Sequence, residues 1–227
     1  PRGVITAAQN DARYLHGGNI VEVEGKDLLS SASPAQVLPT LALEQLPNRD
    51  SIPYGNIYEL DGADTIYRGT LRYAGWSKIM HDFKIGGLLE MGVALPESAK
   101  TWRDVLDHLN INADTVSANT HETLSWLGAY DDSHALSEDA LSAASIGDAF
   151  CTLLQEKLEF GSTERDMCLM KHDFEVVYDD GSKPPEKKSS LMLAYGDPNG
   201  DSAMAKTVGL TVAIGAQLYL DGDLGAC

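Results

Sequence analysis

The chain has 227 residues and carries 34 Asp and Glu side chains against 17 Lys and Arg, which gives a formal net charge of -17 at pH 7. This acidity disfavours nucleic acids and anionic membrane surfaces as partners, because both present negatively charged phosphates. The 3 cysteines and 6 histidines are widely spaced, so we expect no disulfide framework, no metal site and a reducing intracellular location.

The first part of the chain predicts strands followed by a helix. Residues 19–24 alternate apolar and polar side chains after Gly17-Gly18, the pattern of a half-buried strand that follows a turn. Residues 64–73 are rich in β-branched and aromatic side chains and predict another strand. Residues 77–89 place apolar side chains at helical spacing and end near a Gly-Gly pair, so we expect a helix there.

The middle of the chain changes to helical patterns. The predicted helices cover residues 102–109, 137–144 and 149–158. Thr101 and Ser137 stand where N-cap residues belong. Most of the acid excess lies between residues 88 and 160, so this part is predicted to be a small helical subdomain with a solvated acidic exterior.

The last part of the chain returns to strands and closes with a helix. Residues 167–178 form a long apolar-rich run that ends at the turn signal Asp179-Asp180-Gly181. Residues 189–195 provide a partner strand, so we expect a hairpin with Pro184-Pro185 at its tip. Residues 202–221 predict a long helix. No apolar run approaches the roughly 20 residues that cross a bilayer.

Arginines are concentrated in two short segments of this otherwise acidic chain. A guanidinium group suits a carboxylate, because its planar edge donates two parallel hydrogen bonds. In a strand, alternate residues share a face, which would align Arg68, Thr70 and Arg72 at about 6.6 Å per two-residue step. These side chains predict a pocket for a small anion with several carboxylates. The alternative is an exposed strand face whose charge is balanced by nearby acids.

A second polar motif, Asn48-Arg49-Asp50, follows Pro47, whose fixed φ angle favours a turn. The amide, guanidinium and carboxylate groups of the motif can bind a polar ligand. The alternative is an Asx turn formed by Asn48 or Asp50, with the Arg49 side chain in solvent.

The loop at residues 196–202 offers a similar choice. It can present backbone N–H groups to an anion at the start of the last helix, or it can be a turn in which Ser202 is the N-cap. The turn is the stronger interpretation. The sequence contains no G-x-G-x-x-G dinucleotide fingerprint and no Ser-His-Asp or Cys-His arrangement of a nucleophile.

Taken together, these motifs resemble the glutamate-forming saccharopine dehydrogenase family. The resemblance is carried, in order, by residues 1–4, 46–51, 67–76, 164–167 and 194–210. It covers essentially the whole chain, and the helical middle is the most divergent part. Residues 202–210 look closest to the bifunctional lysine-degrading members, in which a lysine-ketoglutarate reductase half comes first.

The resemblance implies a fold and a reaction. The implied fold is α/β (α+β): a mixed β-sheet substrate-binding and dimerisation domain, resembling the C-terminal domain of glyceraldehyde-3-phosphate-dehydrogenase-like oxidoreductases, with a helical insertion. The implied enzyme oxidises saccharopine with NAD(P)+ to L-glutamate and 2-aminoadipate 6-semialdehyde, or runs the reverse reaction, in lysine metabolism. Saccharopine carries three carboxylates, which agrees with the anion pocket predicted from the arginines.

By the same resemblance, residues 1–87 and 161–200 would form the mixed-sheet domain, residues 88–160 a helical lid, and residues 201–227 the start of the return to a Rossmann domain. That Rossmann domain would bind NAD or NADP outside this chain, and the proton-transfer residues would lie there too. The abrupt ends of the chain suggest a piece of a longer polypeptide. We expect the piece to be inactive alone, and to form a homodimer in the cytoplasm or the mitochondrial matrix.

The residues that match the family's substrate-contacting segments are Asn48, Arg49, Asp50, Arg68, Thr70 and Arg72. We expect carboxylate clamps at Arg49 and Arg68, with Asn48 and Thr70 as orienting hydrogen-bond partners. No position in this chain matches a catalytic acid or base of the family. Two other classes of function stay open, namely a non-catalytic dimerisation or ligand-binding module of the same fold, and an acidic protein-interaction domain.

Overall fold

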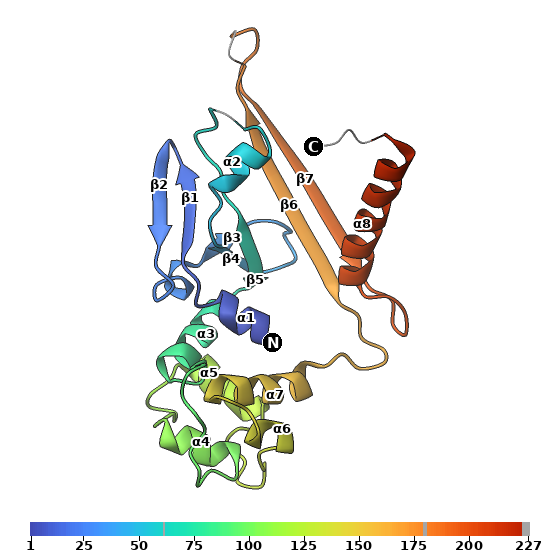
Figure 1. The fold of residues 1–227 in the computed structure, drawn as a ribbon. Helices are drawn as coiled ribbons and strands as arrows, with labels where there is room; N and C mark the ends of the chain where they lie inside the picture. Colours follow the sequence, from blue (N-terminus) through green and yellow to red (C-terminus); the bar gives the residue numbers. More distant parts are fainter. Residues whose placement is uncertain (61, 179–180, 224–227) are drawn as a thin grey trace. The chain divides into compact units, whose positions relative to one another are not determined.

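The computed structural model describes residues 1–60, 62–178 and 181–223 and combines helices with small sheets (Figure 1). The chain divides into two compact units, Pro1–Leu158 and Glu159–Cys227. Each unit has sheets of its own. The mixed helix-and-strand character that the sequence predicts is therefore confirmed.

The first unit contains two small antiparallel sheets. Their strands are β1 (Ala12–His16) with β2 (Asn19–Val23), and β3 (Ser33–Ala35), β4 (Leu43–Pro47) and β5 (Gly69–Tyr73) in the order β3-β4-β5. Gly17 and Gly18 join β1 to β2 with φ angles of 54° and 77°. A two-residue hairpin turn needs this left-handed backbone, which glycine adopts freely. The strand predicted after the Gly-Gly pair is confirmed as β2.

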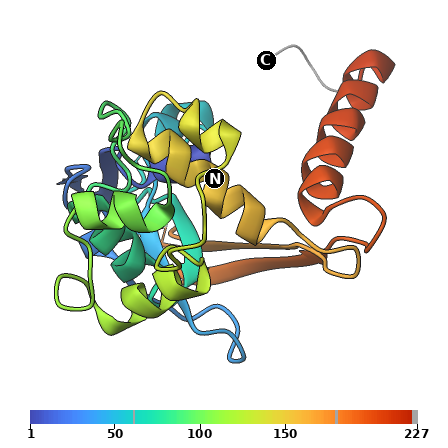
Figure 2. The same ribbon diagram turned by 90° about the horizontal axis from the view of Figure 1, so that it is seen from below.

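The helices between residues 76 and 158, coloured green to yellow, group together in Figure 2. The helices of the unit are α1 (Arg2–Ala7), α2 (Pro53–Ile57), α3 (Trp76–Ile85), α4 (Trp102–His108), α5 (Ala118–Trp126), α6 (Glu138–Leu141) and α7 (Ile146–Leu158), with a 3₁₀ turn at Leu29–Ser31. The side chains of Thr101 and Ser137 cap α4 and α6, so both predicted N-caps are confirmed. The sequence pattern misses α5, because only Thr120 and Leu124 of its largely polar sequence are buried.

One hydrophobic core joins these helices to the N-terminal segment. The Phe150 ring on α7 packs edge-on against Phe83 on α3 and Trp102 on α4, with ring centroids 5.1 and 6.1 Å apart. Ile5 on α1 and Leu29 belong to the same buried cluster. Complete burial of a large apolar side chain contributes about 1.5–3 kcal/mol. The helical part of the chain therefore shares its core with residues near the N-terminus.

The second unit is a long hairpin followed by a helix (Figure 1). Its elements are β6 (Met167–Val176), β7 (Glu186–Tyr195) and α8 (Ala203–Asp221). The two strands pair antiparallel along their whole length, from Met167 opposite Tyr195 to Val176 opposite Glu186. The predicted hairpin and final helix are thus confirmed. The turn predicted at Asp179-Asp180 lies outside the described residues, as do residues 224–227 of the predicted return segment.

The sheets differ from the single mixed sheet that the resemblance implies. Among the described residues the named strands form three separate sheets, and every pairing is antiparallel. The β1–β2 and β6–β7 pairs are hairpins, and a hairpin connection makes antiparallel pairing necessary. Parallel pairing occurs, in the described part of the chain, as an isolated bridge between Arg13 and Asp50.

Two predicted elements have different ends in the structure. The strand expected over residues 64–73 begins only at Gly69, and Ile66 before it makes a single bridge to Leu15. The helix expected over residues 77–89 ends at Ile85, because the chain turns at the following glycines. The second of these, Gly87, has a φ angle of 88°, which other residues rarely adopt.

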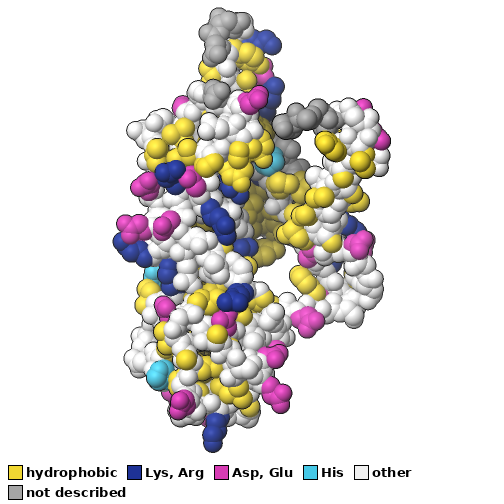
Figure 3. All heavy atoms as spheres, viewed as in Figure 1, with side chains coloured by type: hydrophobic (Ala, Val, Ile, Leu, Met, Phe, Trp, Pro, Cys, Tyr) yellow, Lys and Arg dark blue, Asp and Glu magenta, His cyan; other side chains and the backbone are white. Residues whose placement is uncertain are grey.

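The helix α8 is unusually apolar for its exposure. Hydrophobic side chains lie along it in Figure 3. The helix has 19 residues, and an 18-residue window of it has a mean hydropathy of 1.2 with 6% of the window buried in this structure, so by length and composition alone it could cross a membrane. The sequence pattern does not flag it, because Thr, Gly and Gln interrupt its apolar residues. A core helix of a soluble protein meets the same criterion.

Candidate functional site

One face of the β4–β5 pair collects polar residues that the sequence singles out. The register places Glu44 opposite Arg72 and continues past the strand end, where the Asn48 N–H donates to the Arg68 carbonyl at 2.9 Å. Residues opposite one another in an antiparallel pair, and every second residue along each strand, share a face. The predicted site residues on this face are Asn48, Arg68, Thr70 and Arg72.

Arg72 forms no ion pair with an acid of the described residues, although Glu44 lies opposite it. The Glu44 carboxylate instead accepts hydrogen bonds from the N–H groups of Gly75 at 3.0 Å and Ser77 at 2.6 Å, at the start of α3. The Arg72 guanidinium lies over the Trp76 ring, with Cζ 4.8 Å from the ring centroid. Its Nε is buried and has no hydrogen-bond partner among the described residues. Burial lowers the pKa of Arg72, but an arginine side chain stays charged in a protein.

Arg68 is held in a similar way. Its Cζ lies 4.1 Å from the centroid of the Tyr54 ring on α2. Its backbone N–H donates to the buried Ser51 hydroxyl at 3.0 Å. Its guanidinium makes no hydrogen bond or ion pair with the rest of the described chain. The aromatic ring therefore holds one face of the guanidinium and leaves the donors at its edge free.

The Asn48-Arg49-Asp50 motif forms the Asx turn that the sequence offers as an alternative. The Asp50 carboxylate accepts hydrogen bonds from the Ile52 N–H at 2.9 Å and from the Arg13 guanidinium at 2.7 Å. These bonds, first that from Ile52 and then that from Arg13, lower the pKa of Asp50. Arg49 is exposed, has a φ angle of 55°, and pairs with no acid in the part of the chain that the structure describes.

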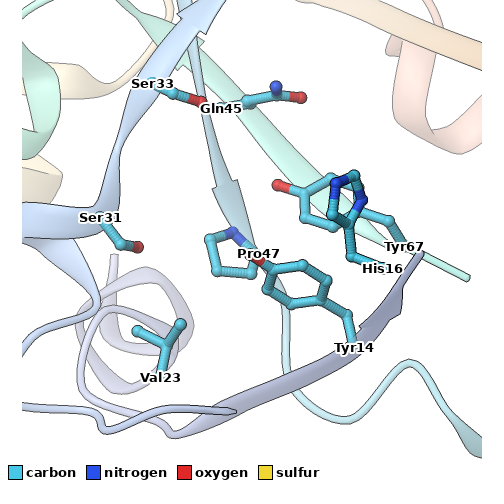
Figure 4. A pocket seen from close by; sticks show the side chains of 8 residues that line it. All are labelled: Tyr14, His16, Val23, Ser31, Ser33, Gln45, Pro47 and Tyr67. Carbon is cyan, nitrogen blue, oxygen red and sulfur yellow. The ribbon is translucent and has the colours of Figure 1, made fainter. Parts of the chain in front are cut away.

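The cavities of the first unit lie beside this sheet. A small one of about 30 Å³ is lined by Asn48, Thr70, Arg72 and Trp76, together with apolar residues. A larger one of about 310 Å³ is lined by Tyr14, His16, Val23, Ser31, Ser33, Gln45, Pro47 and Tyr67 (Figure 4). No Arg, Lys, Asp or Glu lines the larger cavity. Of these two cavities, the small one therefore places a cation, Arg72, beside the polar residues of the predicted site.

Within the larger cavity, the Tyr14 and Tyr67 rings meet edge to face with centroids 5.1 Å apart. Burial, and to a smaller degree the neighbouring Tyr14, raises the pKa of Tyr67 to about 12. The Tyr67 hydroxyl is therefore neutral at physiological pH. This lining contains no arginine or lysine that would form a bidentate or ionic contact with a carboxylate.

The start of α8 is capped from within the chain. The Asp166 carboxylate accepts hydrogen bonds from the N–H groups of Ala203 at 2.7 Å and Met204 at 3.0 Å. The Ser202 side chain accepts a further hydrogen bond from Ala205 N–H. The interpretation of residues 196–202 as a turn with Ser202 as the N-cap is therefore confirmed, and the helix N-terminus already holds an anion.

In residues 1–60, 62–178 and 181–223, no group of three or more His, Cys, Asp and Glu side chains is placed to hold a metal ion. Cys151 is buried on α7, and burial raises the pKa of its thiol. A buried thiol of raised pKa is a poor nucleophile.

Several residues that contact the predicted site are not predicted from the sequence. Tyr54 and Trp76 back the two arginines, Ser51 fixes the Arg68 backbone, and Arg13 pairs with Asp50. Trp76 could be found from its place four residues after Arg72, at the first residue of α3. The contacts of Arg13 and Tyr54 carry no local signal, because they depend on how separate segments pack.

Comparisons with known proteins agree with one another. Residues 1–226 match the family described as Saccharopine dehydrogenase C-terminal domain. The chain is 38% identical over 246 residues to alpha-aminoadipic semialdehyde synthase, mitochondrial, of Mus musculus, which covers 100% of this chain and 26% of the mouse protein. It is 32% identical over 244 residues to saccharopine dehydrogenase (NADP(+), L-glutamate-forming) of Schizosaccharomyces pombe, covering 97% of this chain and 53% of that enzyme.

A solved structure is similar over nearly the whole chain. Apo histidine-tagged saccharopine dehydrogenase (L-Glu forming) from Saccharomyces cerevisiae aligns with a TM-score of 0.87 and 28% sequence identity, covering 99% of this chain and 54% of that chain. The chain thus spans 26% of the length of the mouse relative and 53% of that of the S. pombe relative.

Proposed function

Because the chain belongs to the saccharopine dehydrogenase C-terminal domain family, we propose that it is the substrate-binding portion of a saccharopine-oxidising enzyme. In the proposed reaction, saccharopine, NAD(P)+ and water give L-glutamate, 2-aminoadipate 6-semialdehyde and NAD(P)H with release of a proton; the reverse is a reductive condensation. Relatives that match nearly the whole chain are named saccharopine dehydrogenase and alpha-aminoadipic semialdehyde synthase.

The observation that carries this proposal is the set of unpaired arginines. Arg49 lies in the loop after β4, Arg68 just before β5 and Arg72 on β5, and none pairs with a carboxylate of the described residues, although the chain carries 34 acids. A guanidinium that has no internal partner is available for an external anion. Saccharopine supplies three carboxylates, so its charges and those of the site are complementary.

Each polar residue of the site takes a role in the proposal. Arg49 and Arg68 bind carboxylates through bidentate hydrogen bonds, and Arg72 holds a further one. Asn48 and Thr70, which share a sheet face with Arg68 and Arg72, orient the substrate by hydrogen bonds. Positioning of this kind contributes to catalysis by holding the reacting C–N bond in place.

Asp50 acts at a different point of the same loop. Its carboxylate already accepts hydrogen bonds from Arg13 and from the Ile52 N–H. We therefore assign Asp50 to the site as the residue that fixes the loop carrying Arg49. The lone pairs that remain on its carboxylate oxygens leave room for a direct contact with the substrate amine.

The cofactor is proposed to bind mainly outside this chain. The S. pombe relative is named for NADP(+), and a nicotinamide cofactor supplies the hydride acceptor for an oxidation of this type. The chain has no G-x-G-x-x-G turn between a strand and a helix, and its described strands pair antiparallel. These residues do not fit a dinucleotide site, so none is assigned to NAD or NADP.

The finer architecture is also proposed. Residues 1–87 and 161–200 would be the substrate-binding and dimerisation domain, similar to the C-terminal domain of glyceraldehyde-3-phosphate-dehydrogenase-like enzymes. Residues 88–160 would be the lid and residues 201–227 the return to the cofactor domain. Because α7 of this lid shares one hydrophobic core with α1 and α3, the lid would move together with those two helices. A homodimer inside the cell, in the cytoplasm or the mitochondrial matrix, completes the proposal.

Substitution of the arginines in the complete enzyme tests the proposed function. Arg49→Ala and Arg68→Ala should each lower kcat/KM for saccharopine roughly 10- to 150-fold, since a hydrogen bond to a charged group contributes about 1.5–3 kcal/mol. Lys at either position should restore activity only in part, because an ammonium group lacks the bidentate edge. Arg103→Ala on α4, whose guanidinium pairs with exposed Asp107, is the matched control. Unchanged kcat/KM in both site variants would remove the assignment.

The chain alone provides a second test. We expect no saccharopine-dependent reduction of NAD+ or NADP+ at 340 nm, even at high protein concentration, because no dinucleotide site fits the described residues. Clear turnover by the isolated chain would contradict the division of roles proposed above. Light scattering across micromolar to millimolar concentrations tests the dimer, and a strictly monomeric species would count against it.

A further inference from the structure

Two arginines of the proposed site rest on aromatic rings from separate helices. Tyr54 on α2 lies under Arg68, with 4.1 Å between its ring centroid and Cζ, and Trp76 on α3 lies under Arg72 at 4.8 Å. Both distances fall within the range of about 6 Å over which a ring attracts a cation. The repetition of this arrangement at two positions of one sheet face indicates a common role.

The ring under Arg68 is fixed by its own surroundings. Tyr54 stacks on Tyr58 one turn later in the chain, with ring centroids 5.7 Å apart and 29° between the planes. The Tyr54 backbone N–H donates a hydrogen bond to the Ser51 carbonyl at 3.2 Å, and the Ser51 hydroxyl accepts a hydrogen bond from the Arg68 N–H at 3.0 Å. Ser51 is 1% exposed. One buried residue thus ties the Arg68 backbone to the segment that carries its ring.

The ring under Arg72 is fixed by the start of α3. Trp76 packs against the buried core of the unit. The Glu44 carboxylate accepts hydrogen bonds from the N–H groups of Gly75 and Ser77, the residues on either side of Trp76. The residue opposite Arg72 in the sheet therefore anchors the ring under Arg72 and does not neutralise the arginine.

Stacking by the face has a consequence for binding. The N–H donors of a guanidinium lie in its plane, so a ring on one face leaves the edge free to bind a carboxylate bidentately. A side chain held in this way before binding loses less conformational entropy when the ligand arrives. In an acidic chain, the rings also hold the arginines without consuming their charge.

We propose that Tyr54 and Trp76 are positioning residues that set the planes of Arg68 and Arg72 for two different carboxylates of the substrate. This inference rests on the proposed function and deepens it. Arg68 and Arg72 are four residues apart, roughly 13 Å along a strand at about 3.3 Å per residue. The pair therefore selects a ligand whose carboxylates lie at separated points, and a short monocarboxylate can satisfy only one of the two arginines.

Kinetics of the complete enzyme with saccharopine provide the test. Tyr54→Leu and Trp76→Leu should each raise KM roughly three- to tenfold, with kcat within about twofold of the parent, by the strength of a cation–ring contact. Tyr54→Phe and Trp76→Phe keep a ring and should restore KM. Tyr73→Leu is the control, because Tyr73 is 60% exposed on the same strand and makes no ring contact among the described residues. In an Arg68→Ala background, Tyr54→Leu should have no further effect.

A graded substitution covers the case in which a Leu variant does not fold. Fluorinated phenylalanines at position 54 keep the size of the ring and weaken its negative face, so KM should rise with the number of fluorine atoms. A KM that ignores fluorination, or a Tyr54→Leu effect that persists without Arg68, would overturn the inference alone. If Arg68→Ala and Arg72→Ala themselves leave KM unchanged, the proposed function fails as well, and the two failures are thereby distinguished.

Discussion

The Arg13 guanidinium on β1 donates a hydrogen bond to the Asp50 carboxylate at 2.7 Å and ties the first hairpin to the loop that carries Arg49. The backbone strengthens this link, since the Arg13 N–H donates to the Arg49 carbonyl at 2.9 Å and the Ser51 N–H to the Arg13 carbonyl at 2.7 Å. The Asp50 carboxylate thus fixes the conformation of the loop through its hydrogen bonds within the chain.

If Asp50 acts by ordering this loop, its ion-pair partner should matter equally. Arg13→Gln and Asp50→Asn should raise KM for saccharopine by the same factor, and the double variant should be no worse than either single one. Asp50→Asn keeps an acceptor for the Ile52 N–H, so thermal melts should change little. Lys26→Gln, at an exposed ion pair after the same hairpin, is the control. A KM increase in Asp50→Asn alone would mean that the carboxylate itself contacts the substrate.

Substitution of Arg49 by glycine separates binding from stability. Arg49 has a φ angle of 55°, and a non-glycine residue pays about 1–2 kcal/mol for that backbone. Arg49→Gly relieves this strain and gives back about 0.5–1 kcal/mol through the greater freedom of the unfolded chain. We therefore expect the free energy of unfolding to stay within about 1 kcal/mol of the parent, while kcat/KM for saccharopine falls as in Arg49→Ala. Denaturant melts and steady-state kinetics on the same preparation check both parts, and a large fall in stability would contradict them.

Asp82 on α3 should make the stability of the first unit depend on pH in acid. Its side chain is 9% exposed. It accepts hydrogen bonds from Lys78 at 2.6 Å, Thr120 Oγ1 at 2.8 Å and the Ser117 N–H at 3.1 Å. Burial alone would raise the pKa of Asp82, but these bonds outweigh burial and hold the pKa well below its usual range.

The sign of this dependence follows from linkage. The unfolded chain takes up the proton at its ordinary pKa of about 3.9, so the contribution of Asp82 is complete above that pH and is lost as pH falls toward the native pKa. Asp82→Asn should lower the free energy of unfolding by about 1–3 kcal/mol at pH 7 and flatten its decline below about pH 4. Asp107→Asn, at an exposed pair with Arg103, should change it by less than about 1 kcal/mol. Equal effects of the two substitutions would contradict the assignment.

Gly196 leaves room for the acid that caps α8. A Cβ at this position would collide with the Asp166 carboxylate oxygen and approach the Ala203 nitrogen within 2.9 Å. Gly196→Ala should therefore displace Asp166 and lower both melting temperature and helical circular dichroism. Asp166→Ala should have the same effect, and the double variant should show no additional loss. Gly209→Ala within α8 meets open space and should stabilise the helix by about 0.5–1 kcal/mol. A harmless Gly196→Ala would show that the cap is dispensable.

The sequence predicts local elements well wherever the signal is local. Ser137 and Thr101 identify helix starts, because a side-chain cap needs only the next three residues. The Gly17-Gly18 turn and the alternation after it identify β2 for the same reason. By contrast, the sequence does not predict α5, since its stability depends on hydrogen bonds that the Ser117 N–H and the Thr120 hydroxyl donate to Asp82 of α3.

The sequence by itself determined the family, the strand–helix–strand order and the common face of Arg68, Thr70 and Arg72, because motif wording and side-chain alternation are properties of the chain alone. Tertiary structure alone decided that the Glu44 carboxylate accepts hydrogen bonds at the start of α3 and that the Arg13 guanidinium pairs with Asp50. It also decided that aromatic rings take the place of acids beside the arginines. Such pairings depend on the distances between segments remote in sequence, and the packing of those segments decides which charges are neutralised within the chain.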